Sequence, residues 1–264
     1  MLKLGIAQTH IVWKDKSANL LAMDVYASSA ALRGADVLLF PEMSFTGFCM
    51  ENGEIGETDE HTVKAVSAAA RKNGLAIGFG WVKNIDGISE NHYSIADKNG
   101  KLILDYVKMH PFSFVGEDKH YRHGDSFSFC EISGVRVCVF ICYDLRFPRP
   151  ISIAAPFADL ILIPANWPKA RLKHFETLLD ARAIENQCYF AGINCVGGQS
   201  GTEYAGGSRV ISPKGEVLMC EYGEGLFFCE IDDLSVKIKT YRAEFPALCD
   251  RRGALYDKLE RLGG

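Results

Sequence analysis

Three residues with complementary chemistry stand where buried strands of this chain are expected to end. Glu42 follows one apolar segment, Lys108 closes a second, and Cys142 follows a third. In open α/β sheets, sites form beyond the carboxyl ends of the strands, because loops there bring distant residues together over a rigid support. We therefore expect these three side chains to meet in one site.

Together the three side chains could attack a carbonyl carbon and break a carbon–nitrogen bond. The apolar run 135–141 turns polar directly after Cys142, which puts the thiol at an elbow that a substrate can reach. Free cysteine has a pKa of about 8.5, so it needs a neighbour that accepts its proton. Glu42 can take that proton and return it to departing ammonia. The ammonium of Lys108 can donate to the developing oxyanion.

The elements that must position these residues alternate between strands and helices, as in a layered α/β protein. Periodicity predicts helices at 18–33, 62–72 and 172–187, the first with Leu21, Val25 and Leu32 on one face. Strands are predicted at 2–8, 36–40, 75–82, 92–97, 101–108, 135–141, 160–164, 189–195, 208–211, 216–222 and 226–231. A turn at Lys98-Asn-Gly100 predicts a hairpin. The segments 36–42 and 159–166 are alike, which indicates two similar halves.

Composition narrows the classes of protein and partner. The 264 residues carry a formal net charge of −4 with scattered Lys and Arg, so no surface for binding nucleic acid is indicated. We see no secretion signal, and no apolar stretch reaches the ~20 residues that a membrane-spanning helix needs. Nine cysteines lie mostly inside apolar runs, which fits reduced thiols in the cytoplasm. Without a linker or low-complexity stretch, one domain over residues 1–264 is predicted.

Three motifs resemble, in order and spacing, those of the nitrilase superfamily of carbon–nitrogen hydrolases. They are Pro41-Glu-Met-Ser-Phe-Thr-Gly-Phe48, Tyr106-Val-Lys-Met-His110 and Phe140-Ile-Cys-Tyr-Asp-Leu-Arg-Phe-Pro148. The family also carries a second glutamate between the lysine and the cysteine, and Glu117 stands there. Segments 164–168, 181–187 and 204–216 further resemble the omega-amidase-type branch in its bacterial form.

The resemblance implies a four-layer α-β-β-α sandwich and a homodimer or higher homo-oligomer, without a metal or an organic cofactor. About the last 30 residues are expected to form a tail that contacts the partner. The implied catalytic set is Glu42, Lys108, Cys142 and Glu117, which would convert a small-molecule amide through a thioester and release ammonia. Side chains expected to contact the substrate are Phe48, Tyr143, Arg146, Asn166 and Trp167.

The leading interpretation of the activity is an omega-amidase acting on 2-oxoglutaramate or 2-oxosuccinamate. Other amide hydrolases of the superfamily, such as an N-carbamoyl amino acid amidase or an aliphatic amidase, are the enzyme alternatives. Outside enzymes, the chain could be an idle metabolite-binding protein or a thiol redox sensor centred on Cys142. A sensor would need a resolving thiol close by, and Cys138 is expected too far along the same strand.

Several residues keep a second, structural interpretation. Arg146 could clamp a substrate carboxylate, or it could pair with Asp144 or Glu185. Phe48 and Trp167 could line a pocket or belong to an aromatic core. Three histidines lack the spacing of a zinc motif and are predicted to be solvated loop residues: His110, His120 and His123. The Gly78-Phe-Gly80 segment is predicted to serve tight strand packing, because it lacks the rest of a dinucleotide-binding motif.

Overall fold

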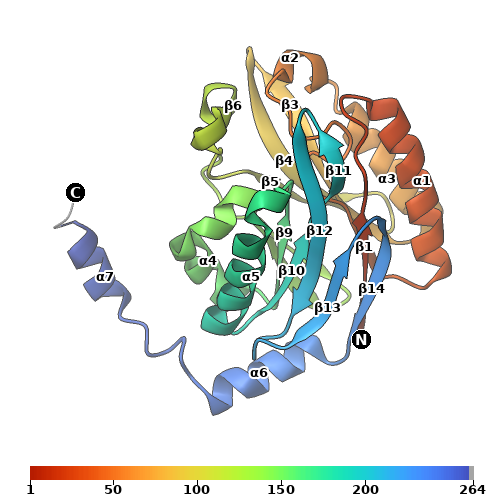
Figure 1. The fold of residues 1–264 in the computed structure, drawn as a ribbon. Coiled ribbons are helices and arrows are strands. Elements are labelled where there is room, and N and C mark those ends of the chain that lie inside the picture. Colours follow the sequence, from red (N-terminus) through yellow and green to blue (C-terminus); the bar gives the residue numbers. More distant parts are fainter. Residues whose placement is uncertain (262–264) are drawn as a thin grey trace.

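The computed structural model contains two mixed β-sheets of seven strands each. They form the centre of the protein (Figure 1). The structure describes residues 1–261, apart from the side chains of residues 259 and 260. The last three residues of the predicted domain and of the predicted dimer-contact tail lie outside this part of the chain.

The first sheet has the strand order β14-β1-β2-β3-β4-β5, with β6 beside β4. Its first three strands along the chain are parallel, and the strands from β3 to β5 are antiparallel neighbours, so the predicted hairpin between β4 and β5 is confirmed. The strands are β1 (Leu2–Gln8), β2 (Val37–Leu39), β3 (Ala76–Ile85), β4 (Ile88–Ala96), β5 (Leu102–Val107), β6 (Tyr121–Arg122) and β14 (Gly225–Ile231).

The second sheet has the order β11-β12-β10-β9-β8-β7, with β13 beside β12. Its strands are β7 (Phe129–Ile132), β8 (Val135–Val139), β9 (Leu160–Pro164), β10 (Tyr189–Ile193), β11 (Val196–Gln199), β12 (Thr202–Ile211) and β13 (Val217–Tyr222). Here β8, β9 and β10 are parallel, as β1, β2 and β3 are in the first sheet. The two similar segments 36–42 and 159–166 therefore contain the middle strand of each parallel trio, β2 and β9.

Residues that alternate along a strand point into different layers, because the side-chain period of a strand is two. On β2, Val37 and Leu39 join the core that contains residues of both sheets, whereas Leu38 joins a core with the helices α1 (Lys16–Leu32) and α3 (His61–Asn73). On the other side of the molecule, α4 (Pro148–Ala154) and α5 (Leu172–Asn186) cover the second sheet (Figure 1). The predicted α-β-β-α sandwich is confirmed.

Helix α1 buries a different face from the one that its large apolar residues indicate. The residues Leu21, Val25 and Leu32 do share a face, but they are 70%, 67% and 90% exposed. The helix instead buries small or slender side chains, namely Asn19, Met23, Ala27 and Ala30. Small residues let a helix approach its neighbours closely, and α1 packs against α3 in this way.

Three further helices complete those of the described chain: α2 (Asn52–Ile55), α6 (Leu234–Glu244) and α7 (Gly253–Glu260). Figure 1 shows α7 set apart from the two sheets, at the end of an extended segment. Within residues 1–261, none of the helices combines the length and apolar character needed to cross a bilayer.

Candidate functional site

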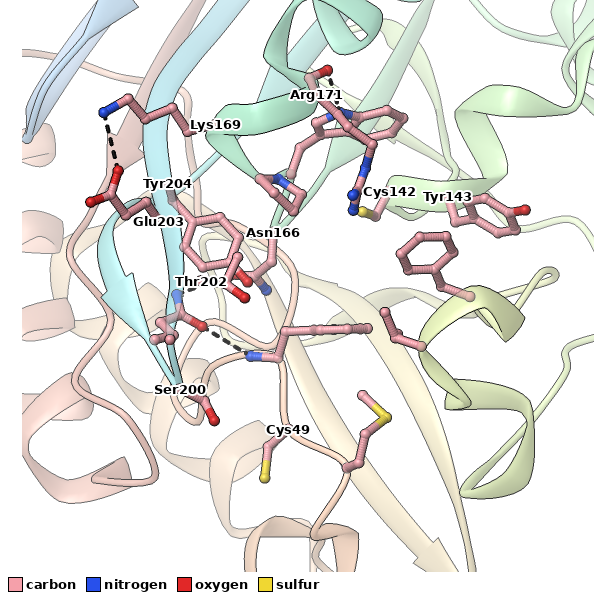
Figure 2. Close-up of a pocket in the computed structure, with 18 of the residues that line it drawn as sticks. Cys49, Cys142, Tyr143, Asn166, Lys169, Arg171, Ser200, Thr202, Glu203 and Tyr204 are labelled. Carbon is pink, nitrogen blue, oxygen red and sulfur yellow. Dashed lines mark hydrogen bonds and ion pairs between the residues drawn. The ribbon is translucent and has the colours of Figure 1, made fainter.

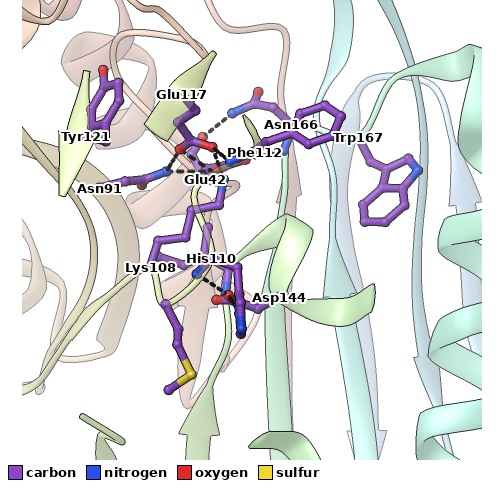
Figure 3. Close-up of polar contacts among 12 residues, drawn as sticks. Glu42, Asn91, Lys108, His110, Phe112, Glu117, Tyr121, Asp144, Asn166 and Trp167 are labelled. Atoms are coloured by element: carbon purple, nitrogen blue, oxygen red, sulfur yellow. Dashed lines mark hydrogen bonds and ion pairs between the residues drawn. The ribbon is translucent and has the colours of Figure 1, made fainter. Parts of the chain in front are cut away.

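Glu42, Lys108 and Glu117 form one buried ionic cluster, although they come from three separate loops (Figure 3). The ammonium Nζ of Lys108 lies 2.8 Å from Glu42 Oε1 and 2.8 Å from Glu117 Oε2. All three side chains are at most 1% exposed. The strands β2 and β5 end just before Glu42 and Lys108, while Glu117 begins a short 3-10 turn. The predicted meeting of Glu42 and Lys108 at strand ends is confirmed.

Cys142 completes the group from the second sheet. It follows β8 and opens a 3-10 turn over Cys142–Arg146 with a positive φ of 45°. Such backbone conformations are uncommon for residues other than glycine and occur where a nucleophile is presented on a tight elbow. The turn exposes part of the thiol to a cavity, as the abrupt change from apolar to polar sequence predicts.

A buried carboxylate fixes this elbow. Asp144 accepts hydrogen bonds from the backbone N–H of Ile141 at 2.9 Å and from the hydroxyl of Tyr106 on β5 at 2.9 Å. It also accepts the backbone N–H of His110 at 2.8 Å and contacts His110 Nδ1 at 2.7 Å. The strand that leads to Lys108 and the turn that begins with Cys142 are therefore tied to one side chain.

His110 is not the solvated loop residue that its sequence context predicts. Besides its contact with Asp144, its ring stacks on Phe147 with centroids 3.9 Å apart. The sequence gave no indication that His110 contacts Asp144, because the two residues are 34 positions apart. Among residues 1–261, no three or more His, Cys, Asp or Glu side chains are arranged to hold a metal ion.

Backbone groups fix the Glu42 carboxylate at the seam between the sheets. The backbone N–H of Asn166, which follows β9, donates to Glu42 Oε2 at 3.0 Å, and the Asn166 amide donates to the Glu42 carbonyl at 2.7 Å. On the other side, a Cβ on Gly80 would lie 2.2 Å from the backbone nitrogen of Met43. The Gly78-Phe-Gly80 segment therefore serves close packing, as predicted, and this packing supports the loop that carries Glu42.

The pKa values of Cys142, Glu117 and Lys108 are all raised, but for different physical reasons. Burial, followed by the charge of Glu42, raises the pKa of the Cys142 thiol well above its ordinary value. Burial also raises the pKa of Glu117, against the opposing charge of Lys108. Burial alone would lower the pKa of Lys108, but the charges of Glu117 and Glu42 outweigh it and hold that pKa well above its ordinary value. These shifts favour the charged ammonium of Lys108 and the neutral thiol of Cys142.

A cavity of about 730 Å³ is lined by Cys142 and Lys108. Figure 2 shows Cys142 among the residues around it. All five residues expected to contact a substrate line it: Phe48, Tyr143, Arg146, Asn166 and Trp167. Glu42 and Glu117 are fully buried and lie outside its lining. The cavity thus offers a small molecule the thiol, the ammonium and several aromatic surfaces.

Arg146 takes neither of the structural partners considered for it. Asp144 is occupied by Tyr106 and His110, and Glu185 pairs with Arg182 at 3.0 Å. The Arg146 guanidinium instead lies over the Trp167 ring, 4.9 Å from its centroid, and contacts His174 at 3.3 Å. Among the described residues no carboxylate pairs with Arg146, so its charge faces the cavity.

Sequence reasoning missed several residues of the site. Arg171 lines the cavity with its guanidinium 5.5 Å from the Phe112 ring. Gln199 accepts the backbone N–H of Phe48 at 3.1 Å and donates to Asn166 Oδ1 at 3.2 Å. Arg171 lies three residues after the segment 164–168, at the end of β9, so its closeness to that segment in the sequence could have indicated that it belongs to the site. The sequence around Gln199 carried no comparable signal.

Comparisons with known proteins agree with this geometry. The carbon-nitrogen hydrolase family model matches residues 3–237. The chain is 34% identical to an omega-amidase from Escherichia coli, over 94% of this chain and 96% of that protein. It is 38% identical to a 2-oxoglutaramate amidase from Bacillus subtilis, over 96% of this chain and 98% of that protein.

Solved structures show the same fold. A CN-hydrolase superfamily protein from Xanthomonas campestris superposes with a TM-score of 0.88 at 31% identity, over 95% of this chain and 97% of the other. An amidase from Nesterenkonia superposes with a TM-score of 0.85 at 24% identity, over 98% and 96% of the two chains. The predicted resemblance is confirmed, and so is the prediction of a hydrolase acting on carbon–nitrogen bonds of amides. The chain belongs to the carbon–nitrogen hydrolase family.

Proposed function

We propose that this carbon–nitrogen hydrolase is an omega-amidase, which removes the terminal amide of a small 2-oxo dicarboxylic monoamide, with Cys142 as nucleophile. The observation that carries the proposal is the Arg146 guanidinium, which faces the same cavity as the thiol and has no carboxylate partner among the described residues. A guanidinium is a planar donor that matches a carboxylate. The names of the bacterial relatives, omega-amidase and 2-oxoglutaramate amidase, support the same substrate class.

The first chemical step forms a bond between Cys142 sulfur and the amide carbon. Glu42 takes the thiol proton as the sulfur attacks, and the carbonyl oxygen becomes an oxyanion that accepts a hydrogen bond from Lys108. The neutral resting thiol supports this assignment, because such a thiol needs a base at the moment of attack. When the intermediate collapses, the carbon–nitrogen bond breaks and Glu42 returns the proton to the leaving ammonia.

The second step hydrolyses the thioester. Glu42 accepts a proton from water as the water oxygen attacks the thioester carbon, and it then gives that proton to the departing sulfur. The products are the dicarboxylic acid and the free thiol, and Glu42 is again a carboxylate, ready for the next turnover. In this scheme Glu117 holds Lys108 by an ion pair of 2.8 Å and keeps the ammonium in position to donate to the oxyanion.

Ammonia release from paired substrates tests the proposal. A 2-oxo dicarboxylic monoamide and a neutral amide of similar length are compared in wild type and in Arg146→Met. Wild type should favour the acidic substrate, and the variant should lose ten- to hundredfold in kcat/KM on that substrate alone, because a charge-assisted hydrogen bond is worth about 1.5–3 kcal/mol. Lys169→Met is the control, because this cation of the cavity rim is exposed and pairs with Glu203.

Two results would contradict the substrate assignment. Equal losses on both amides would make Arg146 a structural residue. Preference of the wild type for a neutral amide or for an N-carbamoyl amino acid would move the enzyme to another activity of the family. Rapid-quench mass spectrometry of the wild type with its best substrate should find the acyl group on the peptide that contains Cys142, and an adduct on another cysteine would move the nucleophile.

We also propose a cytoplasmic homodimer. All nine cysteines are free thiols, which supports a reducing compartment. Exposed apolar side chains on α4 and α7 and beside α4, namely Ile153, Tyr256 and Phe157, support a contact between two copies. Light scattering of the wild type should give twice the chain mass, and Phe157→Glu should shift the protein toward the monomer. A wild-type monomer at micromolar concentration would contradict the proposal.

A further inference from the structure

Asn91 lies inside the ionic cluster but was not among the predicted site residues. It sits on β4 and is 1% exposed. Its amide Nδ2 donates to Glu42 Oε1 at 2.8 Å and to Glu117 Oε1 at 3.1 Å. Its backbone carbonyl accepts the backbone N–H of Lys108 at 2.9 Å. One residue therefore contacts both carboxylates and the strand end that carries the ammonium, as Figure 3 shows.

Asn91 and Lys108 bridge the same two oxygen atoms. The ammonium Nζ lies 2.8 Å from Glu42 Oε1 and 3.0 Å from Glu117 Oε1, the two atoms to which the Asn91 amide donates. Two buried carboxylates that share one cation repel each other, and such pairs tend to bind a proton. A neutral amide gives each carboxylate another donor without adding a charge. The bridge therefore lowers the cost of keeping both carboxylates ionised.

The orientation of the amide is fixed by these carboxylates. If the amide were rotated by half a turn, its oxygen would face two carboxylate oxygens. In the observed orientation Asn91 Oδ1 is buried, and none of the described residues donates to it. An unpartnered buried acceptor is unfavourable, so the two charge-assisted bonds of Nδ2 must outweigh that cost.

The bridge also assigns separate tasks to the two oxygens of Glu42. Oε1 accepts hydrogen bonds from Lys108 and Asn91, whereas Oε2 accepts the backbone N–H of Asn166. Oε2 is therefore the oxygen with capacity to exchange a proton with the thiol of Cys142. Lys108 Nζ lies within hydrogen-bond distance of Glu42 Oε1 and of both oxygens of Glu117, so these two carboxylates and the Asn91 amide together fix the position of the ammonium.

We propose that Asn91 is a positioning residue for amide hydrolysis: its side-chain amide bridges Glu42 and Glu117, holds the two carboxylates around the Lys108 ammonium and presents Oε2 of Glu42 to the Cys142 thiol. This inference rests on the proposed roles of Glu42, Lys108 and Cys142. It does not depend on which amide is the substrate.

The test compares Asn91→Ala and Asn91→Asp with the control Ser94→Ala, which removes another fully buried polar group from β4. Asn91→Ala should lower kcat by ~10–10²-fold, a size typical of misplaced acid–base groups, and change KM less than about threefold. Donors favour the ionised form of a carboxylate, so their loss raises its pKa. The acid limb of the kcat/KM profile should therefore move to higher pH, and Ser94→Ala should leave it in place.

Asn91→Asp keeps the shape of the side chain and supplies the test if the alanine variant does not fold. It adds a third carboxylate beside Glu42 and Glu117, so its activity relative to the wild type should be lowest at alkaline pH. That ratio should rise as the pH falls, because a protonated carboxyl regains a donor. A ratio that is the same at every pH would overturn the inference, as would an acid limb in Asn91→Ala that matches the wild type.

Alkylation of Cys142 by iodoacetamide separates this inference from the proposed function, because it needs no substrate. If Glu42 assists thiol ionisation, the pH dependence of alkylation should shift in Asn91→Ala as the kinetic limb does. If the alkylation profile shifts in Asn91→Ala but the wild type does not hydrolyse 2-oxo acid monoamides, the role of Asn91 is supported and the proposed substrate class is rejected. Normal hydrolysis of these amides by Asn91→Ala would reject the role of Asn91 and leave the substrate standing.

Discussion

Cys142 lines the cavity and is partly exposed, but the pKa of its thiol is raised. Burial and the charge of Glu42 raise its pKa well above the ordinary value, so the folded protein keeps the neutral form at neutral pH. An unperturbed cysteine would ionise near about pH 8.5. The difference in ultraviolet thiolate absorbance between wild type and Cys142→Ala should therefore show no step between about pH 6 and pH 8.5. A step within that range would mean that Cys142 rests as a thiolate and needs no base.

Cys142→Ala should abolish ammonia release while the protein stays folded. The substitution removes one sulfur atom at the wall of a cavity, so the free energy of unfolding should change by less than ~1 kcal/mol. The measurements are ammonia release and a thermal melt. Cys138→Ala is the matched control, because Cys138 is fully buried on β8, the strand that leads to Cys142, and its substitution should lower stability but not kcat. Residual turnover by Cys142→Ala above the blank would remove Cys142 from the covalent role.

Residues that stand directly after an apolar strand were predictable from the sequence, and residues within a strand were not. Glu42, Lys108 and Cys142 could be selected because the chain turns polar at those points. Asn91 lies inside β4, next to the buried His92, so its contacts depend on the pairing of strands rather than on a local pattern. Asp144 was considered only as a partner of Arg146, because the sequence does not reveal that His110 and Tyr106 lie beside it.

At the scale of elements, β3 supports the site because Gly80 has no side chain and lets the strand pack against the loop that carries Glu42. A Cβ at position 80 would lie 2.2 Å from the backbone of Met43 and 2.8 Å from the carbonyl carbon of Glu42. Gly80→Ala should therefore displace the Glu42 loop, lowering kcat by up to ~10²-fold and stability by ~1–3 kcal/mol.

The control for Gly80→Ala is Gly198→Ala on β11, where an added Cβ meets no atom within 4 Å. The measurements are kcat and chemical unfolding of both variants. If Gly80→Ala loses stability but keeps the wild-type kcat, the contact is a packing feature without influence on Glu42.

Element types were more predictable than the faces that the elements bury. The parallel strands and the helices α1, α3 and α5 lie close to their predicted positions, because runs of apolar residues and turn signals are local. The buried face of α1 was not predictable, because its contacts are made by alanines whose size matters only against α3. The short strands β6, β7 and β11 were missed, and each is paired with a longer strand from another part of the chain or the next hairpin arm.

At the scale of the whole molecule, the buried thiols should make the fold sensitive to alkali. Burial raises the pKa of Cys130, Cys138 and Cys188 to about 12 and that of Cys229 to about 11. The unfolded chain loses these protons near about pH 8.5, whereas the folded protein keeps them. Their contribution to stability is therefore complete below about pH 8.5 and falls as the pH rises toward the folded values.

Urea unfolding under reducing conditions at about pH 8 and pH 10 measures this effect. The free energy of unfolding should fall between the two pH values, and Cys188→Ala should reduce the fall by removing one titrating group. Cys249→Ala, at an exposed cysteine, should not reduce it. An equal fall in both variants would assign the alkaline sensitivity to other groups.

The candidate site is divided between the two sheets, so the chain can be split into two fragments that each carry part of it. Glu42, Asn91, Lys108 and Glu117 precede the irregular, mostly exposed segment 123–128, whereas Cys142 and Asn166 follow it. A break at this segment yields two fragments, one with the proton carrier and ammonium, the other with the sulfur. The second also contains β14, the antiparallel partner of β1, which gives it a means of recognising the first. Neither fragment alone should therefore release ammonia from the substrate. Ammonia release would report that the two fragments have come together and reassembled both sheets.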